Sequence, residues 1–113
     1  MFTATMPLGA GERLTLKVSP AVAFAPANLV VRASIALDAD NRAIEIVAES
    51  QDFLRSSEIE LQGDKAPHTS LFEFRNLPSG TYVVSANLLG INGESRAKIR
   101  QQINVLASGA DRR

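Results

Sequence analysis

Apolar and polar residues alternate along most of this chain. The first case is LTLKVS, in which Leu14, Leu16 and Val18 alternate with Thr15 and Lys17. Alternation with a period of two residues is typical of a strand that buries one face. The same pattern recurs over residues 29–37, 43–50, 58–62, 70–77, 81–89 and 95–106. The alternation therefore predicts seven strands.

Turn-forming and proline-containing segments separate the predicted strands. Pro20 and Pro26 bracket an apolar segment that is either an extended link or an eighth strand at a sheet edge, because proline cannot donate to a β-ladder. The sequence DADN at 38–41 is typical of a turn. Asn92-Gly93 is a strong signal for a hairpin between the last two strands.

No segment has the sustained 3.6-residue periodicity of an amphipathic helix. The less regular stretch QDFLRSS predicts a connection in which Phe53 and Leu54 are anchored under the core. Many short strands, with few glycines and no regular hairpin repeat, favour an all-β sandwich over a closed barrel.

The stretch LPSGTYVVSANL contains the only tyrosine of the chain, Tyr82. The spacing from Leu77 to Gly80 to Tyr82 resembles the tyrosine corner of Greek-key sandwiches, in which the Tyr hydroxyl bonds a main-chain group a few residues upstream. Gly80 allows a turn without a Cβ penalty, and Pro78 fixes one turn dihedral. The motif therefore predicts a structural role for Tyr82.

With Tyr82 on strand F, nearly the whole chain resembles immunoglobulin-like and fibronectin type III-like domains. It is similar in particular to the disulfide-free modules of bacterial exported and surface proteins, which often carry a run like F-x-F-x-N-L-P-x-G-T-Y. Val84 stands where antibody-type domains have a cysteine, and Ile44 or Ile46 takes the place of their core tryptophan. Transthyretin-like and carboxypeptidase-regulatory-like modules share the phrase NLPxGTY and are the alternative within the all-β class.

This resemblance implies a seven-stranded, or eight-stranded, Greek-key immunoglobulin-like β-sandwich. It implies a non-catalytic structural or protein-interaction module of a larger bacterial exported or surface protein, located in the periplasm or at the cell surface. The expected partners are another protein or neighbouring domains of the same chain, and no cofactor is expected. The alternative function is an accessory carbohydrate-binding module of a secreted enzyme.

Composition narrows these expectations. The chain has 113 residues, of which 45% are hydrophobic and 21% charged, and this is one domain's worth of sequence. We expect an extended or disordered segment over 1–12, the sandwich over 13–106 and a flexible tail over 107–113. The 12 basic and 12 acidic residues cancel, which disfavours nucleic-acid binding. We also expect no membrane insertion and no signal peptide, because no apolar run is long enough and the N-terminus lacks a basic start.

Few residues suggest chemistry. The chain has no cysteine, and its one histidine, His68, ends the polar loop GDKAPH, where an exposed loop residue is the expected interpretation. Asp38, Asp40 and Asn41 are weak candidates for calcium ligands, because calcium prefers clustered oxygen ligands. The same residues are common turn formers, so we expect no metal site.

Charged side chains along one face of the last strand suggest an interaction surface. Arg96, Lys98 and Arg100 alternate and are expected to share the outer face that also carries Glu45 and Glu49. Cross-strand charge pairing on a solvated face is the simpler interpretation, and a binding face for an acidic ligand or neighbouring domain is the alternative.

The aromatic residues give little support to a sugar-binding platform. Phe72, Phe74 and Tyr82 fall in the inward register, and the remaining phenylalanines are scattered along the chain.

Overall fold

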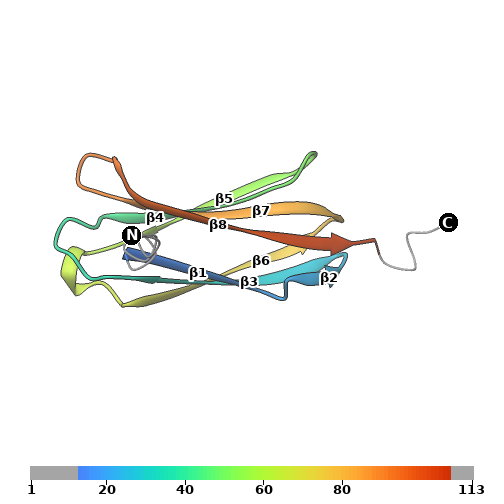
Figure 1. Ribbon diagram of the computed structural model, residues 1–113, viewed down its shortest axis with the longest axis horizontal. Coiled ribbons are helices and arrows are strands. Elements are labelled where there is room, and N and C mark those ends of the chain that lie inside the picture. The colour runs from blue at the N-terminus through green and yellow to red at the C-terminus, as the bar shows by residue number, and fades with distance from the viewer. Residues whose placement is uncertain (1–12, 108–113) are drawn as a thin grey trace, which may run out of the picture.

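The structure is a computed structural model that describes residues 13–107, and these residues form two β-sheets that face each other (Figure 1). The strands are β1 (Leu14–Ser19), β2 (Val22–Phe24), β3 (Ala27–Ile35), β4 (Ala43–Glu49), β5 (Leu54–Glu60), β6 (Thr69–Leu77), β7 (Gly80–Leu89) and β8 (Ser95–Leu106), with one 3-10 turn, η1 (Gly63–Lys65). The predicted all-β class is confirmed. The predicted N-terminal segment over 1–12, and the predicted tail from 108 onward, lie outside the described residues.

One sheet has the strand order β1-β3-β6, and the other has the order β2-β8-β7-β4-β5. All pairs are antiparallel except β2 and β8, which run parallel. The segment between Pro20 and Pro26 is therefore a strand, β2, and it lies at a sheet edge as the sequence allows. The hairpin predicted at Asn92-Gly93 joins β7 to β8, and Gly93 adopts the positive φ of 79° that such a turn requires.

The core lies between the inner faces of the two sheets. Strands β3, β4 and β7 bury alternate residues, which confirms the period-two interpretation. The largest fully buried side chains are Tyr82, Phe74, Leu14, Leu29, Ile35, Ile44, Ile46, Leu77, Leu88, Ile103, Val31 and Val84. Phe72 packs against this core beside Phe74, with 4.8 Å between ring centroids.

Tyr82 closes the turn between β6 and β7. Its hydroxyl donates a 2.8 Å hydrogen bond to the main-chain oxygen of Pro78, while its ring is fully buried. Gly80 has a φ of 156°, and a Cβ there would lie 3.3 Å from the Ser50 Cβ. The predicted hydrogen bond to an upstream main-chain group is confirmed, and glycine is needed at this turn for its backbone conformation and close packing.

The segment around Phe53 differs from the predicted connection. Residues 54–60 form β5, which pairs with β4, and Leu54 is 65% exposed instead of anchored under the core. Of these two residues, only Phe53 packs against the core. Its ring contacts the Tyr82 ring edge to face, with 6.2 Å between the ring centroids. Because β5 lies at the sheet edge and most of its side chains are exposed, little hydrophobic alternation marks it in the sequence.

On each open side of the sandwich, one side chain bridges the two sheets. The Gln101 amide accepts from the Val18 N–H at 3.1 Å and donates to the Val18 oxygen at 3.2 Å, so it pairs with the free edge of β1 as another strand would. On the other side, the Arg55 guanidinium donates to the Arg75 oxygen of β6 at 2.8 Å. These contacts join the two sheets at their rims.

Candidate interaction surface

The outer face of the five-stranded sheet carries the predicted charged residues, but their arrangement differs from the prediction. The expected order holds, since β8 pairs with β7 and β7 with β4. Asn87 of β7 lies between Lys98 of β8 and Glu45 of β4 in one cross-strand row. Lys98 and Glu45 are not joined by any of the ion pairs found within residues 13–107. Across β4 and β5, Glu45 lies directly opposite another carboxylate, Glu58.

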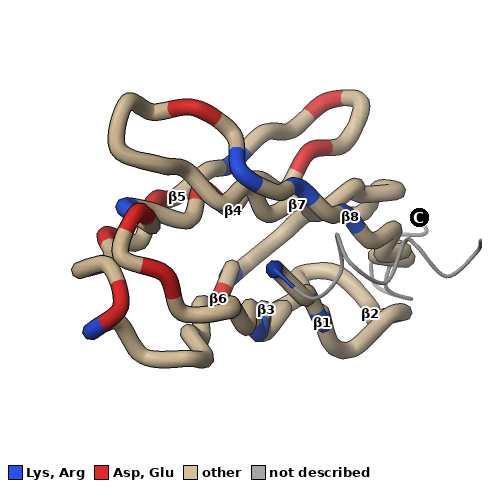
Figure 2. Tube along the Cα trace, turned by 60° about the vertical axis from the view of Figure 1, so that its left-hand side comes forward, with Lys and Arg blue, Asp and Glu red and all other residues tan. Residues whose placement is uncertain are grey.

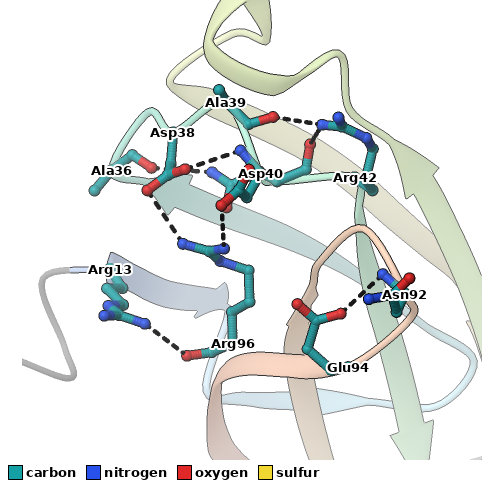
Figure 3. A network of polar contacts seen from close by, with 10 residues as sticks. Arg13, Ala36, Asp38, Ala39, Asp40, Arg42, Asn92, Glu94 and Arg96 are labelled. Carbon is teal, nitrogen blue, oxygen red and sulfur yellow. Dashed lines mark hydrogen bonds and ion pairs between the residues drawn. The ribbon is translucent and has the colours of Figure 1, made fainter.

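Arg96 does not share the outer face with Lys98 and Arg100, and that part of the prediction is wrong. The pairing of β7 with β8 shifts by one residue between Leu88 and Leu89, so strict alternation stops before Arg96 is reached. The Arg96 side chain is only 17% exposed and points toward the loop between β3 and β4 (Figure 3).

Arg96 is the centre of a polar network that ties β8 to this loop (Figure 3). Its guanidinium nitrogens lie 3.1 Å from an Asp38 oxygen and 3.6 Å from an Asp40 oxygen. Asp38 also accepts from the Asp40 main-chain N–H at 2.8 Å, the local bond of an Asx turn. The loop is therefore tied to β8 by the Arg96 guanidinium, and Arg42 also donates to the Ala39 and Asn41 oxygens of the loop.

The same contacts bear on the weak calcium candidates. The Asp38 and Asp40 carboxylates face a guanidinium, which already supplies the positive charge that a metal ion would bring. Asn41 is fully buried and donates to the Ala36 oxygen at 3.1 Å. Among residues 13–107 no group of three or more metal-ligating side chains gathers. We therefore interpret Asp38, Asp40 and Asn41 as residues that stabilise a turn.

His68 lies in an exposed position between η1 and β6, and its main-chain oxygen accepts from the Ile35 N–H at 2.9 Å. His68 thus contacts the end of β3 through its main chain, and this hydrogen bond does not involve its imidazole.

The outer face of the three-stranded sheet presents a basic and apolar surface that the sequence did not indicate. Lys17 of β1 lies directly opposite Arg32 of β3, and Arg32 lies directly opposite Leu71 of β6. Leu71 is 62% exposed and Val30 is 41% exposed. Shallow hollows of about 270 Å³ and about 140 Å³ adjoin each other at Val30. The sequence places Lys17 and Arg32 at outward positions of two strands. Only the pairing of β1 with β3 shows that the two residues lie next to each other.

A second exposed apolar group lies where β2 meets the end of β8. Phe24 is 65% exposed, Val22 54% and Leu106 43%, and Phe24 pairs directly with Leu106. Among the aromatic residues of 13–107, Phe24 is the one that is largely exposed to solvent.

The pKa of the Tyr82 phenol is shifted by its surroundings in the fold. Burial raises the pKa of its phenol above the usual 10.0, while a Ser50 hydrogen bond and the Arg55 charge act in the opposite direction. The neutral phenol is therefore favoured in the folded chain, as a hydrogen-bond donor to Pro78 requires.

Within residues 13–107 no helix is both long and apolar enough to cross a bilayer.

Comparison with solved structures shows the fold alone. A superoxide reductase (neelaredoxin) from Ignicoccus hospitalis is similar with a TM-score of 0.61 at 14% identity, over 83% of this chain and 80% of that one. A family 76 glycoside hydrolase from a bovine Bacteroides thetaiotaomicron strain has a TM-score of 0.60 at 18% identity, over 84% of this chain and 20% of that one. The sporulation control protein Spo0M of Bacillus subtilis has a TM-score of 0.55 at 15% identity, over 85% of this chain and 49% of that one.

No family model matches the chain, and no curated protein is significantly similar to it.

Proposed function

We propose that this chain is an immunoglobulin-like Greek-key sandwich that serves as a non-catalytic structural or protein-interaction module. The strand order supports this fold, since β1, β3 and β6 correspond to strands A, B and E, and β8, β7, β4 and β5 to strands G, F, C and C′. The Tyr82 bond to Pro78 supports it too, because it has the form of a tyrosine corner.

The observation that carries the interaction role is the set of large apolar side chains exposed on the outer surface. Leu71, Phe24 and Leu54 are each more than half exposed, at 62%, 65% and 65%. Contiguous exposed apolar patches rimmed by polar residues are typical of protein-interaction sites, and Phe24 adjoins Leu106 and Leu71 adjoins Val30 in this way. A module of this kind would belong to a larger bacterial protein that is exported or displayed on the surface, which is what the disulfide-free resemblance implies.

Site-specific photocrosslinking in the producing cells tests this proposal. A photoreactive residue at Leu71 or at Phe24 is expected to give discrete protein adducts, because these side chains would lie in the contact. The same residue at Asn92, exposed in the hairpin turn, is the matched control and should give none. Equal labelling at all three positions would contradict a specific protein contact.

The second candidate is an accessory carbohydrate-binding module, and one observation favours it. The similar part of the family 76 glycoside hydrolase covers only 20% of that chain, so this fold occurs there beside a larger remainder. Sedimentation of the chain with insoluble polysaccharides tests it, with Phe24→Ala as the comparison. Polysaccharide binding that Phe24→Ala abolishes would replace the protein-interaction proposal.

A further inference from the structure

The two outer faces of the sandwich each carry an exposed like-charge pair that no ion pair neutralises among residues 13–107. Lys17 lies directly opposite Arg32 on the three-stranded sheet, and Glu45 directly opposite Glu58 on the five-stranded sheet. All four side chains are exposed. Like charges directly opposite each other on antiparallel strands destabilise the pairing.

Neither pair is neutralised within residues 13–107. The ion pairs of this part of the chain join Arg75 to Glu73 and Arg96 to Asp38 and Asp40. Glu73, which is directly opposite Val30, is thus already paired and does not serve Lys17 or Arg32.

The two pairs lie on opposite layers of the sandwich. Figure 2 shows basic positions on β1 and β3 in one layer, and in the other layer acidic positions on β5 together with basic positions on β8. We call the outer surface at Lys17, Arg32, Val30 and Leu71 the basic face, and the outer surface at Glu45 and Glu58 the acidic face. Both charge pairs sit across two antiparallel strands, so their side chains have the same spacing, with Cβ atoms about 4.5–5.5 Å apart.

We propose that a second copy of this chain is a partner, and that the basic face of one copy binds the acidic face of the next. Lys17 and Arg32 then meet Glu45 and Glu58 as two opposite-charge pairs, and Leu71 and Val30 lose solvent beside them. This inference rests on the proposed protein-interaction function and names the partner. Because the two faces differ, the contact is head to tail, and it extends copy by copy unless the rotation closes a ring.

Sedimentation equilibrium of the full chain tests the contact at protein concentrations up to about 1 mM, where weak complexes are populated. We expect association at low ionic strength and a marked decrease at about 0.5 M NaCl, where the Debye length falls below about 5 Å. A chain that stays monomeric at low salt throughout this range would overturn the proposal.

Charge reversal assigns the association to these four residues. The double variants Lys17→Glu/Arg32→Glu and Glu45→Lys/Glu58→Lys should each associate about 100-fold more weakly than the wild type, because each sets like charges against like. An equimolar mixture of the two variants should associate again, since each now presents what the other lacks. Failure of the mixture to associate would overturn the proposal, and circular dichroism confirms that each variant is folded.

The charge-matched control is Lys98→Glu/Arg100→Glu, which changes the net charge as Lys17→Glu/Arg32→Glu does but leaves both pairs intact and makes the acidic face, on which Lys98 and Arg100 also lie, more acidic. Its association should not be reduced, and a loss equal to that of the first variant would show an effect of net charge alone. Different results would overturn the self-contact and the proposed function. A monomeric chain that still crosslinks to another protein through Leu71 overturns only the self-contact, whereas polysaccharide binding that depends on Phe24 overturns the protein-interaction role.

Discussion

At the scale of single residues, Tyr82 is the side chain whose role is best defined. It combines full burial of the ring, an edge-to-face contact with Phe53 and a hydrogen bond to Pro78. Burying a large aromatic ring beside a satisfied hydroxyl is favourable on both counts. Tyr82 therefore stabilises the turn between the two sheets and is not part of either outer surface.

Replacing Tyr82 by Phe isolates the hydrogen bond. We expect Tyr82→Phe to lower the free energy of unfolding by about 1–2 kcal/mol, because the Pro78 oxygen loses its donor while the ring remains. Urea denaturation measures the loss. Ser56→Ala, which removes an exposed hydroxyl on β5, is the control and should change stability little. A Tyr82→Phe effect no larger than that of the control would argue against the corner.

The raised pKa of Tyr82 predicts a pH dependence of stability. The folded phenol holds its proton to a higher pH than the unfolded one, so above about pH 10 the unfolded chain loses the proton first. Stability due to this group is therefore complete below pH 10 and decreases as the pH rises through the folded pKa.

Phenolate absorbance reports this titration directly, because the chain has one tyrosine and no tryptophan. The titration midpoint in native chain should lie above that in urea-unfolded chain. Tyr82→Phe should remove this part of the stability decrease above pH 10. Equal midpoints in the two states would contradict the assigned effect of burial.

At the scale of secondary structure, the rims of the sheets depend on side chains. Gln101 is the clearest case, because one amide satisfies both main-chain groups of Val18 on the free edge of β1. An unprotected strand edge exposes unpaired groups that template aggregation. Gln101 thus links β8 to β1 and shields this edge at the same time.

Removing the Gln101 amide should weaken this link. We expect Gln101→Ala to lower the free energy of unfolding by about 1–2 kcal/mol, as two partly buried hydrogen bonds are lost. Thermal or urea unfolding measures it, and light scattering should show increased aggregation. Gln102→Ala, one residue along on the exposed face, is the matched control. Equal effects of the two variants would show that the amide does not close the edge.

At the scale of the whole molecule, the strand order sets how stability is distributed. Strands β3, β4, β7 and β8 have neighbours on both sides, whereas β1, β2, β5 and β6 each lie at a sheet edge. Amides that are paired inside a packed sheet open only in large unfolding events, whereas edge amides open locally.

Native-state hydrogen exchange followed by NMR should show this order. We expect amides of β7 and β4 to exchange most slowly and those of β2 and β5 most rapidly. Each edge strand provides an internal control, because its amides alternate between those that bond the neighbouring strand and those that have no main-chain partner. The amides without a partner should exchange fast in every edge strand. Protection of β5 equal to that of β7 would contradict the observed strand order.

The sequence by itself determined most of the strands, most of their inward faces and the turn at Tyr82, whereas β5 begins at Leu54 and not at the predicted residue 58. These features follow from local rules: alternation with period two marks a half-buried strand, and the Leu77-Gly80-Tyr82 spacing is contained within a few residues. The prediction failed at β5, where the alternation is irregular. Most side chains of this strand are exposed, as Leu54 is, so burial does not require apolar residues at alternate positions.

Only the tertiary structure decided which charges meet. Pairing partners come from distant parts of the chain, so Lys17 opposite Arg32 and Glu45 opposite Glu58 depend on strand order and register. A one-residue shift in β8 sent Arg96 to the Asp38 loop instead of the outer row, because such a shift reverses the face of every residue beyond it. Strand formation is local in sequence, and the surface that strands build together is not.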